Sequence, residues 1–173
     1  MRYLVALTIV LFSAVAFMQA TKYAPTEDYA IKFSTAKATG TFRDLQGTID
    51  FDPAKLEEAN MDVSVATATI ETGNKTQDKH ARGGSWLDAE HHPRILFKSH
   101  SFAKTAAGYE VDGQLTIRGE SMPVTIPFTF DGKTFAGTVT VARADFGIDG
   151  PFLFGGLVGK EVTVELNVPV KQR

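Results

Sequence analysis

Residues 111–118 read Val-Asp-Gly-Gln-Leu-Thr-Ile-Arg, and residues 124–131 read Val-Thr-Ile-Pro-Phe-Thr-Phe-Asp. In both stretches an apolar or small residue alternates with a polar residue or proline. Because successive residues of a strand point to opposite faces of a sheet, each stretch predicts a strand with one apolar face and one face toward water.

The same alternation recurs along most of the chain and is seldom interrupted by a helical pattern. The strands that it predicts cover residues 29–33, 39–43 continuing into 45–51, 61–72, 95–102, 109–118, 122–130, 135–143 and 161–170. So many half-apolar strands must enclose a shared apolar interior. The pattern therefore predicts an all-β fold, an antiparallel β-barrel of about eight strands, and a barrel of that size can enclose one small ligand.

Two segments lack the alternation. In residues 73–93, Asn74 or Thr76 is expected to cap a short helix that Gly83-Gly84 ends. This predicts a helix-containing excursion outside the barrel. Residues 147–160 are rich in glycine and aromatic side chains. Long loops in small β proteins are usually functional, so residues 147–157 are expected to help gate the mouth, with Phe152 and Phe154 covering an apolar ligand.

The N-terminus has the pattern of a secretory signal peptide. Residues 4–17 are apolar and uncharged, and a small residue, Ala20, stands where cleavage is expected. The apolar run is shorter than the roughly 20 residues that a transmembrane helix requires. We therefore expect residues 1–20 to be a signal peptide that directs the protein to the periplasm or outside the cell. Cleavage after Ala16 or Gln19 is the alternative.

The remaining residues, 21–173, are expected to form one domain, since their number is ordinary for a domain with its own core. The chain has no cysteine, which excludes disulfides, thiol catalysis, thiolate metal sites and a lipid-modified N-terminal cysteine. It has 20 acidic and 18 basic residues and no long basic run, which argues against nucleic acid as a partner.

Several short motifs occur in an order and spacing that resemble a known family. They are Gly40-Thr41-Phe42, Gly47-Thr48-Ile49-Asp50-Phe51-Asp52, Asp78-Lys79-His80-Ala81-Arg82, Trp86-Leu87-Asp88, Pro93-Arg94-Ile95-Leu96-Phe97, Gly113-Gln114-Leu115-Thr116-Ile117-Arg118-Gly119 and Arg143-Ala144-Asp145-Phe146-Gly147-Ile148. With these motifs the chain resembles the YceI-like proteins, which are secreted lipid-binding barrels also called polyisoprenoid-binding proteins.

The resemblance implies an extended lipocalin-like antiparallel barrel that holds a long-chain isoprenoid or a fatty-acid-like amphiphile. In one stretch this sequence departs from the family's pattern. Ser34-Thr35-Ala36 stands where many relatives carry a turn that contains histidine, so no ligand role is carried over to that turn.

Apolar residues on the inward face of the predicted strands are the candidates for contact with the hydrocarbon chain. Ligand pockets are mostly apolar, with few polar groups. The candidates are Phe33, Phe97, Leu115, Ile117, Ile126, Phe128, Val139 and Val164. The alternative is that these side chains only fill a solid core.

His80, Arg82 and Asp78 are the candidates for binding a phosphate or carbonyl head group at the mouth, since arginine suits bidentate contact with such groups. The alternative is structural: Asp78 and Arg82 are four residues apart and can pair on a helix, or they can fix the loop against a strand end. Arg143 and Asp145 present the same two possibilities.

No motif indicates a metal site or a catalytic centre. The spacing of the four histidines matches no zinc pattern, Ser85 lacks the context of a nucleophile elbow, and no motif places two carboxylates together. We therefore expect no cofactor, no metal and no enzymatic activity.

The function predicted from the sequence is that of an exported carrier for a hydrophobic lipid. Such a carrier is expected to be a monomer or homodimer that makes transient contact with membranes. Two alternatives remain at this point: an enzyme that acts on such a lipid, and a β-sandwich module that binds sugars or mediates adhesion.

Overall fold

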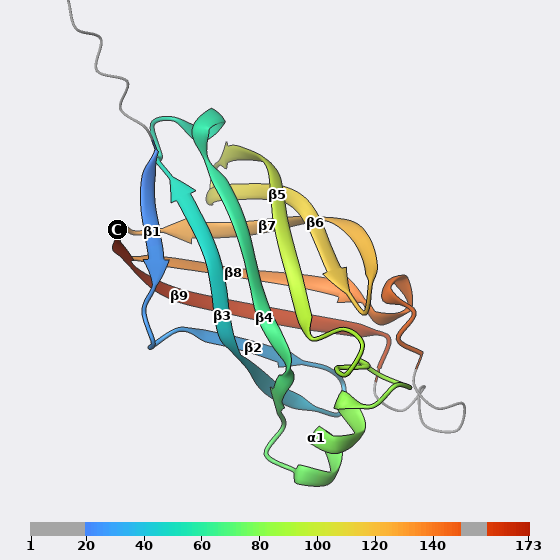
Figure 1. Cartoon of the computed structure of the whole chain (residues 1–173). Coiled ribbons are helices and arrows are strands. Elements are labelled where there is room, and N and C mark those ends of the chain that lie inside the picture. The colour runs from blue at the N-terminus through green and yellow to red at the C-terminus, as the bar shows by residue number, and fades with distance from the viewer. Residues whose placement is uncertain (1–19, 150–158) are drawn as a thin grey trace, which may run out of the picture.

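The computed structural model describes residues 20–149 and 159–173, which form one antiparallel sheet of nine strands (Figure 1). The strands are β1 (Thr21–Pro25), β2 (Ala30–Ser34), β3 (Thr39–Phe51), β4 (Asn60–Glu71), β5 (Arg94–Thr105), β6 (Gly108–Ile117), β7 (Glu120–Phe130), β8 (Thr134–Ala142) and β9 (Glu161–Gln172). The helices are η1 (Leu56–Glu58), α1 (Lys75–Arg82) and η2 (Arg143–Phe146). Residues 1–19 of the expected signal peptide lie outside the described residues.

The sheet closes on itself because β1 and β2 share one position in it. Tyr23 of β1 pairs with β3 on one side and with β9 on the other. Ile31 of β2 pairs with the same two strands farther along the barrel. The nine strands therefore fill eight positions around a barrel. This confirms the prediction of an all-β antiparallel barrel of about eight strands, and the β-sandwich alternative is wrong.

Among the strands of residues 20–149 and 159–173, β1 is the one that the alternation did not predict; it is five residues long and ends at Pro25. The stretch predicted as residues 39–43 continuing into 45–51 is one long strand, β3, whose register with β4 shifts between Thr41 and Arg43 and between Arg43 and Gln46. There Asp44 has φ 58°, and the Arg94 guanidinium donates to the Asp44 carboxylate at 2.8 Å and to the Ser64 hydroxyl at 2.7 Å. These bonds hold the bulge against β4 and β5.

Helix α1 forms where the sequence predicted it, in the excursion between β4 and β5. The Asn74 side chain accepts hydrogen bonds from the amides of Thr76 and Gln77, which caps the first turn. The helix ends at Gly83, whose amide donates to the His80 carbonyl. In Figure 1, α1 lies at the end of the barrel opposite the C-terminus.

The pairing between β7 and β8 is short. In the part of the chain that the structure describes, β7 and β8 pair only between Phe128–Phe130 and Phe135–Gly137. Two prolines, Pro123 and Pro127, lie in the rest of β7, and proline cannot donate a hydrogen bond to a neighbouring strand. Beyond the paired region η2 packs against both strands, so that Phe146 is buried to 1 % exposure.

Aromatic side chains fill the end of the barrel that lies away from α1. Phe51 is fully buried at their centre, and its ring lies between 5.2 and 5.9 Å from five other rings. Those rings belong to Phe102, Tyr109, Phe128, Phe130 and Phe135. Most pairs are edge-to-face, the arrangement that aromatic quadrupoles favour. This aromatic cluster closes one end of the interior. None of the helices in residues 20–149 and 159–173 is long and apolar enough to span a membrane.

Candidate functional site

The interior between the aromatic cluster and α1 is a cavity of about 1010 Å³. Ligand pockets commonly measure about 300–1,000 Å³, so this cavity is large for a domain of this size. Aliphatic and aromatic side chains make up most of its described lining. An apolar space of this size favours a hydrocarbon ligand over water, because buried water needs several polar partners.

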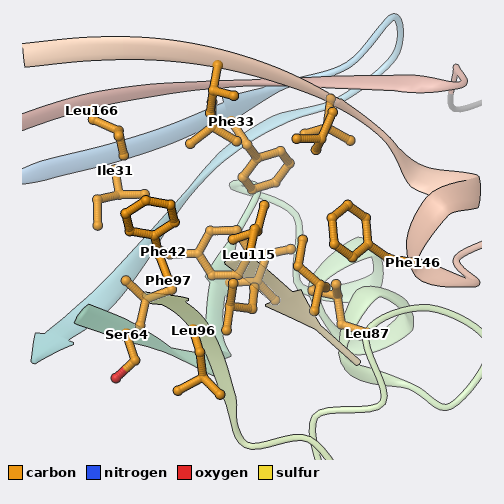
Figure 2. Close-up of a pocket in the computed structure, with 18 of the residues that line it drawn as sticks. Ile31, Phe33, Phe42, Ser64, Leu87, Leu96, Phe97, Leu115, Phe146 and Leu166 are labelled. Carbon is orange, nitrogen blue, oxygen red and sulfur yellow. The ribbon is translucent and has the colours of Figure 1, made fainter. Parts of the chain in front are cut away.

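Figure 2 shows how side chains from separate elements reach the cavity. Phe33 of β2, Phe42 of β3 and Phe146 of η2 extend toward the same space. Ser64 and Leu96 border the cavity as well. Ser64 accepts the Arg94 bond described above, and Leu96 is 43 % exposed. Along β7 the alternation separates lining residues such as Ile126 and Phe128 from exposed ones such as Thr125 and Thr129, whereas at Ser64 and Leu96 it does not.

All eight strand residues predicted from the apolar alternation line the cavity. They are Phe33, Phe97, Leu115, Ile117, Ile126, Phe128, Val139 and Val164. Phe128 also belongs to the aromatic cluster, so the core and the cavity wall are partly the same residues. Direct contact of these side chains with a ligand stays a prediction. Phe152, Phe154 and the gate predicted for residues 147–157 lie largely or wholly outside the described residues.

The mouth of the cavity is formed by the segment after α1 and by η2. The Arg143 side chain connects these two elements. The Arg143 side chain is buried, donates at 2.7 Å to the carbonyls of Ile148 and Gly159, and lies over the Trp86 ring. The Arg143 guanidinium therefore stabilises, in part, the backbone that forms the mouth. The sequence left a structural and a ligand role open for Arg143 and Asp145, and Asp145 is exposed.

A second arginine connects the same elements from the hairpin between β6 and β7. Arg118 has φ 54°, and its guanidinium donates to the Gly147 carbonyl at 2.6 Å and to the Gly84 carbonyl at 2.8 Å. Next to it, a side chain at Gly119 would lie 2.9 Å from the His92 ring. The hairpin thus holds the two elements of the mouth against each other.

Among the head-group candidates, only His80 lines the cavity. The Asp78 carboxylate accepts hydrogen bonds at 2.7 Å from the hydroxyl and the amide of Thr72, and these bonds hold the pKa of Asp78 below its ordinary value. Arg82 donates to the Ile70 carbonyl at 2.8 Å. Both side chains attach α1 to the end of β4, which is one of the structural alternatives that the sequence left open. The attachment is made by these bonds to Thr72 and Ile70, and not by an ion pair between Asp78 and Arg82 along the helix.

Comparison with known proteins gives the family of this barrel. A model of the YceI-like domain matches residues 18–170. The chain belongs to the YceI-like domain family. Among curated relatives, a UPF0312 protein of Pseudomonas syringae pv. tomato is 34 % identical over 137 residues, which are 73 % of this chain and 71 % of that protein.

Solved structures share the fold of this YceI-like domain. Burkholderia cenocepacia BcnA matches with a TM-score of 0.75 and 25 % identity, over 83 % of this chain and 96 % of BcnA. A polyisoprenoid binding domain from Saccharophagus degradans matches with a TM-score of 0.63 and 10 % identity, over 90 % of this chain and all of that domain. The likeness to the second domain is one of fold alone.

Three titratable side chains of the YceI-like domain meet outside the cavity. His91 Nδ1 lies 2.9 Å from an Asp88 oxygen, and His92 Nε2 lies 4.0 Å from the other. The hydrogen bond to Asp88 raises the pKa of His91, and the same bond lowers the pKa of Asp88. Over the described ranges, no three histidine, aspartate or glutamate side chains are grouped as metal ligands would be.

Several residues of the mouth were not predicted as ligand contacts from the sequence. Trp86, Leu87, Phe146 and Ile148 line the cavity but lie in irregular segments, where alternation gives no inward face. One signal was available: Trp86 is the only tryptophan of the chain and lies in a polar stretch. A large apolar side chain in such a stretch is often buried against a distant element.

Proposed function

We propose that this protein is an exported carrier that encloses the hydrocarbon chain of a lipid, an isoprenoid or a fatty-acid-like amphiphile, inside its barrel. The observation that carries the proposal is the apolar cavity of about 1010 Å³, closed at one end by the aromatic cluster. The name of the Saccharophagus domain, which has the same fold, supports a polyisoprenoid as one form of the ligand.

The cavity also sets the orientation of the lipid. Its deep wall is made of side chains such as Ile49, Phe97 and Val168, while its polar lining is concentrated around α1 and the segment after it. A hydrocarbon tail gains about 0.8 kcal/mol for each CH₂ group that it buries. The tail therefore lies toward the aromatic cluster, and the head group lies toward α1.

A carrier role fits the site better than catalysis. Three charged groups near the mouth have structural partners: Asp78 bonds to Thr72, Arg82 to Ile70, and Arg143 in part to two backbone carbonyls. The expected signal peptide supports a carrier in the periplasm or outside the cell, which takes up lipid during transient contact with a membrane.

The test is extraction of lipid from protein purified from its native host, followed by mass spectrometry. Two neighbouring variants make it specific. Val139 lines the cavity and Thr138 is exposed on the outer face, so Val139→Trp fills the cavity while Thr138→Trp does not. We expect one lipid class to be enriched with the unchanged protein and with Thr138→Trp, and to be lost with Val139→Trp.

A protein that carries no lipid in any of the three forms, and takes up none when supplied, would contradict the carrier function. Equal lipid in Val139→Trp and Thr138→Trp would show that the lipid lies outside the barrel. Conversion of the bound lipid to a product during incubation would instead favour an enzyme.

A further inference from the structure

The charged side chains in the cavity lining have one sign. Within the described residues the lining includes Lys37, Lys79 and Arg143, together with the His80 imidazole, and it includes no aspartate or glutamate. The whole chain has more acidic than basic residues, with a net charge of −2. The basic lining is therefore a local feature and does not reflect the overall composition.

These basic groups gather at one end of the cavity. Lys37 lies in the tight turn between β2 and β3, which is closed by hydrogen bonds between Thr35 and Ala38. In that turn Ala36 approaches Gly159 so closely that a side chain at Gly159 would lie 3.1 Å from the Ala36 Cβ. The Gly159 carbonyl accepts a bond from Arg143. The turn that carries Lys37 thus adjoins the mouth.

Lys79 reaches the same mouth from α1. It lies in the last turn of this helix, and the segment that follows brings Trp86 under the Arg143 guanidinium. Lys37 and Lys79 are both exposed at the rim, whereas Arg143 is buried. Two lysine ammonium groups from different elements therefore flank the opening through which a head group meets solvent.

Two carboxylates of the same excursion have other partners. Asp78 accepts two hydrogen bonds from Thr72, and Asp88 is bonded to His91. Neither side chain lines the cavity. A carboxylate within the lining would partly neutralise the lysines of the rim. Asp78 and Asp88 lie outside the lining and have a smaller effect.

From this arrangement we infer that the lipid has a negatively charged head group, a carboxylate or a phosphate, which Lys37 and Lys79 bind at the rim of the cavity. The inference rests on the proposed carrier function and deepens it by naming the head-group class. Both lysines have a flexible stem and three donors, so they can reach an anion that lies outside the apolar lining. A neutral alcohol or amide gains no such interaction.

Matched pairs of amphiphiles test the inference on delipidated protein. Hexadecanoic acid is compared with hexadecan-1-ol, and farnesyl monophosphate with farnesol, by calorimetry or by quenching of Trp86 fluorescence. We expect at least one anion to bind about five- to tenfold more tightly than its alcohol, as two partly exposed ion pairs permit. The difference should shrink when salt rises from about 0.01 M to about 1 M.

The double variant Lys37→Gln with Lys79→Gln should remove this preference and leave the affinity for the alcohols unchanged. The control is Lys104→Gln with Lys133→Gln. Lys104 pairs with Tyr109 of the aromatic cluster, and Lys133 lies in the hairpin turn before Phe135. Both are at the closed end, so this control should keep the preference for the anion.

The results separate the two proposals. Preference for the acid but not the monophosphate indicates a fatty acid, and the reverse indicates a prenyl phosphate; both support the inference. Alcohols that bind as tightly as the anions, or a preference that survives in the Lys37/Lys79 double variant, would overturn the anionic head group while the carrier function stands. Failure of all four amphiphiles to bind would overturn the carrier function, and the inference with it.

Discussion

The Arg143 guanidinium lies over the Trp86 ring, with its central carbon 5.3 Å from the ring centroid. This contact joins η2 to the segment that follows α1, and both elements line the mouth of the cavity. The same guanidinium donates to the carbonyls of Ile148 and Gly159. One side chain therefore connects η2 and Gly159, just before β9, with the segment after α1, which is distant in the sequence.

Replacing Arg143 with Met should destabilise the fold by about 2–4 kcal/mol. One buried and one partly buried carbonyl oxygen would lose a charged donor, and the stacking on Trp86 would be lost. Arg143→Lys should recover only part of this loss, because lysine lacks the planar fork that reaches both carbonyls. Urea denaturation followed by circular dichroism measures the change in the free energy of unfolding.

Arg173→Met is the matched control for Arg143. Arg173 is exposed at the C-terminus, and its backbone amide, not its side chain, donates to the Lys22 carbonyl. Its substitution should change stability by less than about 0.5 kcal/mol. Equal effects of the two substitutions would show that the contacts of Arg143 contribute little to stability.

The barrel was predictable because its strands have one wet and one apolar face. Ile126 and Phe128 alternate with Thr125 and Thr129 in the sequence, and the structure buries the first two and exposes the second two. Alternation needs no knowledge of distant contacts, since neighbouring residues of any strand point to opposite faces. The strand residues that line the cavity could be predicted for the same reason.

The mouth could not be predicted in this way because its partners are distant in the sequence and irregular in local structure. Nothing near Arg82 indicates that its guanidinium donates to Ile70, and nothing near Arg118 indicates the carbonyls of Gly84 and Gly147. Each arginine binds a backbone carbonyl, which every residue type supplies, so the sequence carries no signal for these contacts. The structural alternative for Arg82 and Asp78 accounts for these bonds, and their role toward a ligand stays a prediction.

Stability should fall in acid partly because of Asp78. Its hydrogen bonds to the Thr72 side chain and amide lower its pKa in the folded protein. Between the folded and the unfolded pKa the unfolded chain binds more protons, so this stabilisation is present above the ordinary value of 3.8 and is lost as pH falls below it. We expect Asp78→Asn to be less stable at neutral pH and to lose less stability between about pH 5 and pH 2.

Thermal melts of both proteins across this pH range measure the effect, and Trp86 fluorescence reports on the segment after α1. Asp44, Asp88 and Asp131 also have lowered pKa values, so some acid sensitivity should remain in the variant. Parallel curves for the two proteins would mean that the Asp78 bonds do not contribute to acid sensitivity.

Export depends on residues 1–20 if they are a signal peptide. Expression of the full chain should give a shortened protein that begins near Thr21 and is found outside the cytoplasm. A variant that starts with Met followed by residues 21–173 should remain in the cytoplasm. For both proteins, cell fractionation measures the location, and mass spectrometry determines the residue at which the chain begins. Full-length protein that stays in the cytoplasm with residues 1–20 attached would contradict export.

Two adjacent substitutions in β7 test whether the lipid lies in the barrel. Phe128 is 8 % exposed, lines the cavity and contacts Phe51, whereas Thr129 is exposed on the outer face. Phe128→Asp places a carboxylate where it has no partner, which costs at least about 1–3 kcal/mol and removes a ring worth about 3–5 kcal/mol. It should therefore abolish lipid retention and lower stability. Thr129→Asp should do neither.

Because Phe128→Asp can fail to fold, Leu115→Gln serves beside it as a milder change. Leu115 lines the cavity and packs only at the edge of the buried core, so its variant should fold and still retain less lipid. Lipid retention is measured by mass spectrometry of the folded fraction. Lipid lost from Thr129→Asp but kept by Leu115→Gln would reverse the two faces of the barrel wall. Lipid kept by every folded variant would place the lipid outside the barrel, because a hydrocarbon chain inside it cannot avoid these side chains.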